Sequence, residues 1–200
     1  MLDRIRNRLR YGEDVIVVSG LPRSGTSMLM AMLDAGGLPL MTDNRRQPDA
    51  DNPRGYFEME SVKSLGEQAD RSWVRGARGK GLKVISYLLK ELPDDNFYRV
   101  LFARRDLDEV IRSQNLMLGR QNQPNPVDDA KALDLYRKHL VNVQVLMRTR
   151  RNFRMLEVPH RDTLADPQRT AAAINAFLGG RLDAARMAAV VDRELYRNRT

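Results

Sequence analysis

A glycine-bounded turn with an arginine and three hydroxyls is the segment best suited to bind an anion. Residues 20–27 read GLPRSGTS, which follows the spacing of the phosphate loop GxxxxGK[ST], except that threonine replaces its lysine. Glycines let the backbone approach a phosphate, and N–H groups at the start of the next helix point toward it. We therefore expect a phosphate site with Gly25 at the turn and with side-chain donors from Arg23, Ser24, Thr26 and Ser27.

The missing lysine argues against a nucleoside triphosphate bound with magnesium. In nucleoside triphosphatases that lysine bridges the outer phosphates and a metal supplies further charge, whereas here the positive charge is on Arg23. The strand expected at residues 98–103 is followed by Arg104 and Arg105, not by an aspartate that could help to hold magnesium. A ligand with a single 5′ phosphate fits better, and no metal is expected. The alternative is an ordinary strand–turn–helix loop.

Arg105 and Ser113 form a second set of phosphate donors, eight residues apart. Arg105 follows the expected strand, and Asp106 is expected to cap the helix that carries Ser113. Such a helix starts at the carboxyl edge of the sheet, where open α/β sheets bind ligands. Arginine holds phosphate through two parallel hydrogen bonds, and serine adds one donor. The alternative is that Arg105 pairs with a surface acid and that Ser113 is merely exposed.

Together, the two patterns resemble the sulfotransferase superfamily. Residues 21–29 (LPRSGTSML) are similar to its 5′-phosphosulfate loop, and Arg105 and Ser113 match the arginine and serine that grip the 3′-phosphate. The resemblance spans roughly residues 14–178. It implies 3′-phosphoadenosine 5′-phosphosulfate (PAPS) as donor and adenosine 3′,5′-bisphosphate as product. The sulfuryl group would go to a hydroxyl or amine of an acceptor, and carbohydrate, lipid, peptide and small metabolite all remain open.

The same resemblance implies a catalytic set of Arg23, Glu58 and Lys83. Residues 52–58 (NPRGYFE) resemble a stretch of bacterial and carbohydrate- or protein-directed sulfotransferases in which a nearby acid is the base, here Glu58 with Glu60 in reserve. Lys83 stands where the family often has a lysine near the bridging oxygen of the leaving group. The alternatives are a Glu58 placed in a first helical turn for the helix dipole and a Lys83 solvated at a strand edge.

Four other features are expected to lie outside the chemistry. His139 flanks the apolar face of a long helix and suggests a structural residue, and Trp73 suggests a core position rather than an adenine platform. His160 opens HRDTLADP, which resembles the family's Tyr-Glu-Asp-Leu stretch without its aromatic–acid pair, so we expect an architectural role. The resemblance also implies a basic C-terminal loop that closes over the 3′-phosphate. This loop cannot be aligned here, and Arg193, Arg197 and Arg199 would be its substitutes.

Hydrophobic runs and periodic segments alternate along the chain. Strands are expected at residues 14–19, 82–86, 98–103 and 153–158, and helices at 2–11, 26–35, 58–75, 106–118, 127–150, 167–178 and 183–196. This order predicts an α/β three-layer fold with a mostly parallel central sheet covered by helices on both faces, similar in topology to P-loop nucleotide kinases. One sulfotransferase-like domain over residues 1–200 is expected.

The composition restricts the possible chemistry and partners. The absence of cysteine excludes disulfides, zinc–thiolate sites and thiol nucleophiles. A net charge of +8 favours anionic partners, but with 6% aromatic residues a nucleic-acid partner is not expected. The apolar run 15–18 is too short for a signal sequence or a membrane span, so a cytoplasmic protein without an integral membrane segment is expected. Oligomeric state cannot be read from the sequence.

Two other functions share these residues. A small-molecule or nucleotide kinase could use the same loop, although the missing lysine and the missing acidic strand end argue against it. A catalytically inactive protein that has kept only the nucleotide site is the non-enzymatic alternative, and it would bind adenosine 3′,5′-bisphosphate without transferring a group.

Overall fold

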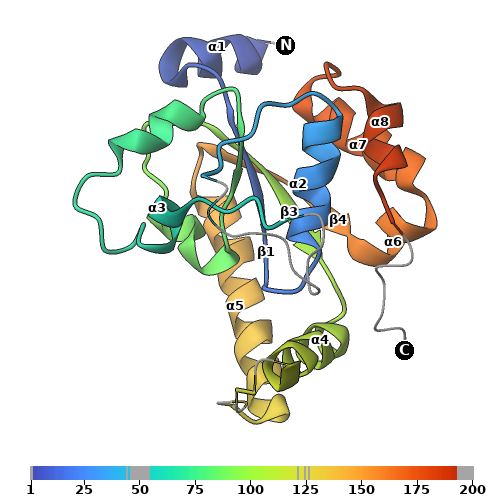
Figure 1. The fold of residues 1–200 in the computed structure, drawn as a ribbon. Helices are drawn as coiled ribbons and strands as arrows, with labels where there is room; N and C mark the ends of the chain where they lie inside the picture. Colours follow the sequence, from blue (N-terminus) through green and yellow to red (C-terminus); the bar gives the residue numbers. More distant parts are fainter. Residues whose placement is uncertain are drawn as a thin grey trace.

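A parallel four-stranded sheet lies at the centre of the molecule (Figure 1). The computed structural model describes residues 2–43, 45, 55–120, 122–123, 125 and 127–192. The strands are ordered β2-β1-β3-β4. Their bounds are Val15–Gly20 for β1, Gly81–Lys83 for β2, Tyr98–Arg104 for β3 and Phe153–Pro159 for β4. Parallel pairing brings all four carboxyl ends to one edge, which is where the candidate site is built.

Helices and turns connect the strands and cover the sheet. The α-helices are α1 (Leu2–Tyr11), α2 (Thr26–Ala35), α3 (Glu60–Lys63), α4 (Leu107–Arg120), α5 (Asp129–Thr149), α6 (His160–Ala165), α7 (Pro167–Leu178) and α8 (Ala184–Ala189). Two 3₁₀ turns are η1 (Ser72–Ala77) and η2 (Ser86–Glu91). Figure 1 shows α2 beside α7 and α8, and α4 near the end of the sheet onto which the loop after β1 opens.

Two hydrophobic cores fill the layers on either side of the sheet. Val15 and Val17 of β1 pack with residues of α3, η1, η2 and α5, whereas Ile16 and Val18 pack with α2, α7 and α8. Successive side chains of a strand point to opposite faces, so this split follows from the pleat. All six residues of β1 are buried because both faces are covered, which confirms the expected three-layer α/β fold.

Most expected elements are present close to the expected bounds. Helix α2 occupies the expected residues 26–35, and the glycine pair ends it as expected: Gly37 has φ +88° and its N–H donates to the Asp34 carbonyl. Asp106 caps α4, because its Oδ1 accepts from the N–H groups of Asp108 and Glu109 at 3.1 and 3.2 Å. The capping side chain therefore orients the helix that carries Ser113 as expected.

The helix expected over residues 58–75 is wrong. Only Glu60–Lys63 form an α-helix there, and Ser72–Ala77 form a 3₁₀ turn. Polar side chains compete with the helical backbone in between: the Gln68 amide donates to the Ser61 carbonyl at 2.9 Å, and Asp70 accepts from the Ser72 N–H at 2.8 Å. Such local bonds stabilise turns at the expense of a helix.

The C-terminal helix is shorter in the described residues than expected. Helix α8 spans Ala184–Ala189, and positions 193–200 lie outside the described part, including the expected phosphate-closing residues Arg193, Arg197 and Arg199. Among the described helices, none combines the length and apolar character needed to cross a membrane.

Candidate active site

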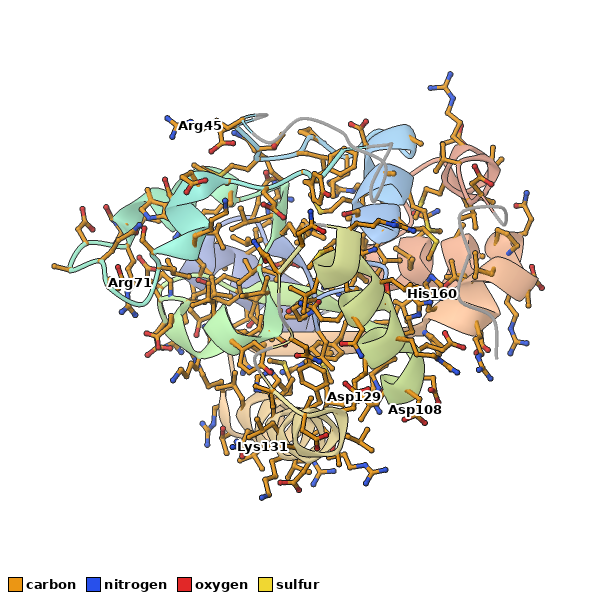
Figure 2. The ribbon with its side chains drawn as sticks, turned by 60° about the horizontal axis from the view of Figure 1, so that its bottom comes forward. Arg45, Arg71, Asp108, Asp129, Lys131 and His160 are labelled. Carbon is orange, nitrogen blue, oxygen red and sulfur yellow. The ribbon has the colours of Figure 1, made fainter. Side chains whose placement is uncertain are left out.

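The predicted site residues meet at the carboxyl edge of the sheet. The glycine loop follows β1, Arg105 follows β3 and Lys83 ends β2. His160 follows β4 at the same edge and begins α6, beside α4 in Figure 2. Because the strands are parallel and in register, segments far apart in sequence converge there.

The loop after β1 adopts a constrained conformation that side-chain contacts hold in place. Arg23 has φ +66°, a left-handed conformation that is uncommon for a residue with a side chain. The Ser24 hydroxyl and N–H both bond to the Leu21 carbonyl, at 2.7 and 3.2 Å. Gly20 cannot be larger, since a Cβ there would lie 2.4 Å from the Ser24 hydroxyl and 2.9 Å from the Ala103 carbonyl. The turn then delivers Thr26 and Ser27 as the first two residues of α2, both partly exposed.

Arg23 joins the loop to the second predicted phosphate set. Its Nε donates to the Ser113 hydroxyl at 3.1 Å, and its carbonyl accepts from Arg105 Nη1 at 3.0 Å. Ser113 is 3% exposed and the Arg105 side chain is 8% exposed, so both face the interior. The alternative, in which Arg105 pairs with a surface acid and Ser113 is exposed, is therefore wrong, because the acid that Arg105 contacts, Glu109, is fully buried. Two sets of anion donors lie in direct contact.

A fully buried carboxylate holds Arg105. Glu109 Oε2 accepts from Arg105 Nε at 3.0 Å, and Glu109 Oε1 accepts from Arg161 Nε and Nη2 at 2.9 and 2.6 Å. A buried carboxylate needs such paired, charge-assisted bonds to offset its desolvation. Arg104, the neighbour of Arg105, instead lies near Glu157 of β4 at 3.8 Å. The two adjacent arginines thus contact different carboxylates.

Glu58 and Lys83, the predicted base and cation, lie together against the loop. Lys83 Nζ donates to the Ser27 hydroxyl at 3.1 Å and to the Tyr56 carbonyl at 2.7 Å. It lies 3.7 Å from Glu58 Oε1, and its side chain is only 9% exposed. The alternative of a solvated Lys83 is therefore wrong. Phe57, directly before Glu58, has φ +51°, so a second strained residue lies at this edge.

Glu60, the reserve acid, has a different environment. Its carboxylate accepts from Lys63 Nζ at 2.9 Å, and its side chain is 53% exposed. Glu58 also lies 3.8 Å from Lys63, but its other oxygen is the one directed at Lys83. Geometry thus separates the two acids, since Glu58 is the one that reaches the cation beside the loop.

His160 packs directly on the glycine loop. A Cβ on Gly25 would lie 2.7 Å from His160 Cδ2, so glycine is required there by close approach as well as by its φ of +101°. Burial, reinforced by the Arg105 guanidinium, lowers the pKa of His160 to about 4, against an opposing effect of Glu109. The imidazole is therefore neutral at pH 7, and its packing on Gly25 connects the C-terminal part of the chain to the loop.

The other two residues considered from the sequence lie in structural environments. His139 Nε2 lies 2.8 Å from the Ser86 hydroxyl, and its ring stacks on Tyr87 at 3.8 Å between centroids. Burial lowers the pKa of His139. Trp73 packs against the first core and donates to Gln68 Oε1 at 2.7 Å.

Two residues of this site, Glu109 and Arg161, were missed by sequence reasoning. Glu109 could have been suspected because it lies one helical turn after Arg105, where a carboxylate reaches its partner. Arg161 had no local signal, because its partner Glu109 is 52 residues away.

The assembled residues fit a ligand with two separate phosphate groups. Arg23, Arg105 and Lys83 bring three cations to one edge, and Ser27 and Ser113 supply hydroxyls. Guanidinium groups, hydroxyls and a helix N-terminus are the donor types that phosphates prefer. Among the described residues, no group of three or more His, Asp or Glu side chains is placed to hold a metal ion.

Comparison with solved structures shows which known fold shares this architecture. Sulfotransferase STF1 from Mycobacterium tuberculosis H37Rv aligns over 94% of this chain and 75% of its own, with a TM-score of 0.59 and 16% identity. The sulfotransferase domain of the Synechococcus PCC 7002 olefin synthase aligns over 94% and 85%, with a TM-score of 0.52 and 20% identity. This chain has the sulfotransferase fold.

A mouse member of the same fold, sulfotransferase SULT7A1 complexed with PAP, aligns over 88% of this chain and 62% of its own, with a TM-score of 0.51 and 17% identity. No model of a known protein family matches the sequence, and no curated protein matches it. The resemblance carried by the glycine loop and by Arg105 and Ser113 is thus confirmed at the level of the sulfotransferase fold.

Proposed function

We propose that this protein is a sulfotransferase, a single domain over residues 1–200 that uses PAPS as donor. One observation carries the proposal: Arg23 contacts both members of the second phosphate set, Ser113 at 3.1 Å and Arg105 at 3.0 Å. A nucleotide with a 5′ and a 3′ phosphate needs two neighbouring anion sites. The PAP complex of a mouse protein with the same fold supports this choice of nucleotide.

The loop and the strand-end arginine would each bind one of the two phosphates. Residues 23–27 would hold the 5′ side through backbone N–H groups and hydroxyls, while Arg105 and Ser113 would hold the 3′-phosphate. Glu109 keeps the Arg105 guanidinium in its orientation by a 3.0 Å bond, so less side-chain entropy is lost when an anion binds. His160, packed against Gly25, is neutral and would contribute no charge to phosphate binding.

Glu58 would act as the general base of the transfer, and Lys83 would stabilise the leaving group. PAPS, when bound, supplies a sulfuryl group whose bond to the phosphate oxygen breaks as a bond to the acceptor oxygen forms. The Glu58 carboxylate would take the proton of the acceptor hydroxyl, and Lys83 Nζ would offset the negative charge on the departing oxygen. Their separation of 3.7 Å, beside Ser27 of the loop, supports these roles.

A transfer assay tests the proposal. The full chain would be incubated with ³⁵S-labelled PAPS and four acceptor probes: a phenol, a disaccharide, a long-chain alcohol and a tyrosine-containing peptide. We expect label on at least one acceptor, equimolar adenosine 3′,5′-bisphosphate, and a rate about 10²- to 10⁴-fold lower in Glu58→Gln. Glu60→Gln is the matched control and should retain the wild-type rate.

Other outcomes would replace the proposal. Phosphate transfer from ATP–Mg²⁺ to an acceptor would make the protein a kinase. Binding of adenosine 3′,5′-bisphosphate without transfer to any probe, and without an effect of Glu58→Gln on slow hydrolysis of PAPS, would make it an inactive nucleotide-binding protein.

A further inference from the structure

A second basic site lies at the opposite edge of the sheet. A cavity of about 490 Å³ opens between α1 and the end of α5. Its lining includes six arginines and no Asp or Glu among the described residues; we call it the arginine pocket, and its arginines are Arg6, Arg10, Arg148, Arg150, Arg151 and Arg154. Nothing in the proposed sulfuryl transfer uses these residues.

The arginine pocket is separate from the candidate active site. Helix α1 precedes β1, and residues 150–154 lead into β4, so the pocket lies at the amino ends of the parallel strands. The glycine loop lies at their carboxyl ends. Strands of six or seven residues at ~3.3 Å per residue place the two sites on the order of 20 Å apart. Figure 1 shows α1 and the loop after β1 at opposite ends of the sheet.

The charge of this pocket is only partly balanced by carboxylates of the described residues. Arg150 pairs with Asp94 and donates to the Leu92 carbonyl at 2.9 Å. Within the described part of the chain, Arg148 and Arg151 have no carboxylate at ion-pair distance, and both are exposed. Crowded guanidinium groups repel one another. A multivalent anion bound between them would offset this repulsion by attracting each group.

The size of the pocket and its residue types indicate the ligand class. Ligand pockets span about 300–1,000 Å³, so a cavity of about 490 Å³ suits a small molecule or a headgroup. Guanidinium forks match phosphate oxygens in pairs. Tyr11 is the aromatic residue of the lining, and it already packs on Phe97 with 6.0 Å between ring centroids. A nucleic-acid strand would need several exposed aromatic rings on which its bases could stack, and the described residues of this lining do not offer them.

We propose that the arginine pocket binds a small group carrying several phosphates, independently of the nucleotide cleft. Its source is either a soluble polyphosphorylated molecule or the headgroup of an anionic lipid. Both present the same chemistry to the arginines, so the experiment needs one arm for each.

Calorimetric titration with sodium tripolyphosphate at 150 mM NaCl is the first arm. The cleft is also expected to take anions, so the titration uses Arg23→Gly, which removes the guanidinium of the loop. Because Arg23→Gly weakens the cleft, we expect the arginine pocket to be the tighter site for tripolyphosphate in this variant. The affinity of this tighter site should fall at least tenfold when Arg148→Glu and Arg151→Glu are added to Arg23→Gly. Arg169→Glu with Arg181→Glu gives the same charge change at exposed positions elsewhere and should leave the affinity unchanged.

Vesicles form the second arm. Phosphatidylcholine vesicles with 5 mol% phosphatidylinositol 4,5-bisphosphate should retain the protein only if a headgroup is the source, and tripolyphosphate should release it. Retention assigns the pocket to lipid, and tripolyphosphate binding without retention assigns it to a soluble ligand. The proposal is overturned if Arg23→Gly binds no tripolyphosphate, if both double variants weaken it equally, or if a 20-nucleotide RNA binds the pocket more tightly than tripolyphosphate. Equal thermal midpoints of the two double variants exclude misfolding as the cause.

Discussion

Arg23 and Ser113 are 90 residues apart in the sequence, and the Arg23 Nε donates to the Ser113 hydroxyl at 3.1 Å. This bond connects the loop after β1 to the second turn of α4. Arg105 strengthens the connection, since its Nη1 donates to the Arg23 carbonyl at 3.0 Å. The loop and the helix are therefore joined directly at the place where we propose that the two phosphates bind.

Arg23→Gly should weaken nucleotide binding at little cost in stability. Charge-assisted hydrogen bonds contribute about 1.5–3 kcal/mol, so the affinity for adenosine 3′,5′-bisphosphate should fall by roughly 10- to 100-fold. Glycine accepts the φ of +66° at this position, whereas alanine does not. Urea unfolding should thus find Arg23→Ala about 1 kcal/mol less stable than Arg23→Gly. Wild-type affinity in both variants would remove Arg23 from the binding site.

Arg105→Lys should damage both stability and nucleotide binding. A lysine cannot bond to Glu109 and to the Arg23 carbonyl with the same fork, and Glu109 is fully buried. Leaving part of a buried charged network unsatisfied costs about 1–3 kcal/mol of unfolding free energy. Arg104→Lys is the adjacent control and should change stability by less than about 0.5 kcal/mol. Equal effects of the two substitutions in urea unfolding would show that the bonds of Arg105 to Glu109 and to the Arg23 carbonyl do not contribute to stability.

Lys83→Met should slow transfer without weakening nucleotide binding by a similar factor. The substitution keeps the length of a side chain that is 9% exposed but removes the ammonium beside Ser27. Loss of a preorganised group that stabilises developing charge costs about 10²- to 10³-fold in kcat. Steady-state kinetics should show this fall in kcat, with a smaller change in KM for PAPS. Lys80→Met, at an exposed position, is the control. A change confined to KM would contradict the role in the leaving-group step.

The free energy of unfolding should decrease at acidic pH because His160 is buried in its neutral form. Its pKa is lowered from 6.5 to about 4 by burial and by Arg105. Below pH 6.5 His160 is protonated in the unfolded chain, whereas in the folded chain it stays neutral until the pH falls to about 4. Full stability is thus present above pH 6.5 and is lost as the pH falls toward 4, by up to ~3 kcal/mol for this group.

Urea unfolding at pH 7.5 and at pH 4.5 measures this effect. The wild-type chain should lose more unfolding free energy between the two values than His160→Gln, which cannot titrate there. His139, whose pKa burial also lowers, remains in both proteins and cancels from the comparison. An equal loss in wild type and variant would show that His160 is not held neutral.

The fold could be read from the sequence where hydrophobic pattern and capping agree. The β-branched run of β1 predicted a strand buried on both faces, and Gly36-Gly37 fixed the end of α2. Residues 58–75 could not be read in this way, because Gln68 and Asp70 make local hydrogen bonds that replace a helix by turns. The periodic hydrophobic pattern that predicts a helix does not report such competition between side-chain and backbone hydrogen bonds.

The candidate site divides in a similar way. Arg105 and Ser113 could be found because their spacing follows from one strand and one helix. The contact of Lys83 with Glu58 depends on how the loop before α3 returns to the sheet, and only the resemblance suggested both residues. Arg161 could not be found, because its pairing with Glu109 depends on the register of β4 against β3.

Thermal unfolding with adenosine 3′,5′-bisphosphate, compared with ATP–Mg²⁺ at equal concentration, tests the central claim most directly. A ligand at a hundred times its dissociation constant stabilises the folded state by ~2.7 kcal/mol. The two phosphate sites that we propose around Arg23 predict a clear rise in the melting temperature with the bisphosphate and a smaller rise with ATP–Mg²⁺. A larger rise with ATP–Mg²⁺, or none with the bisphosphate, would contradict the sulfotransferase proposal.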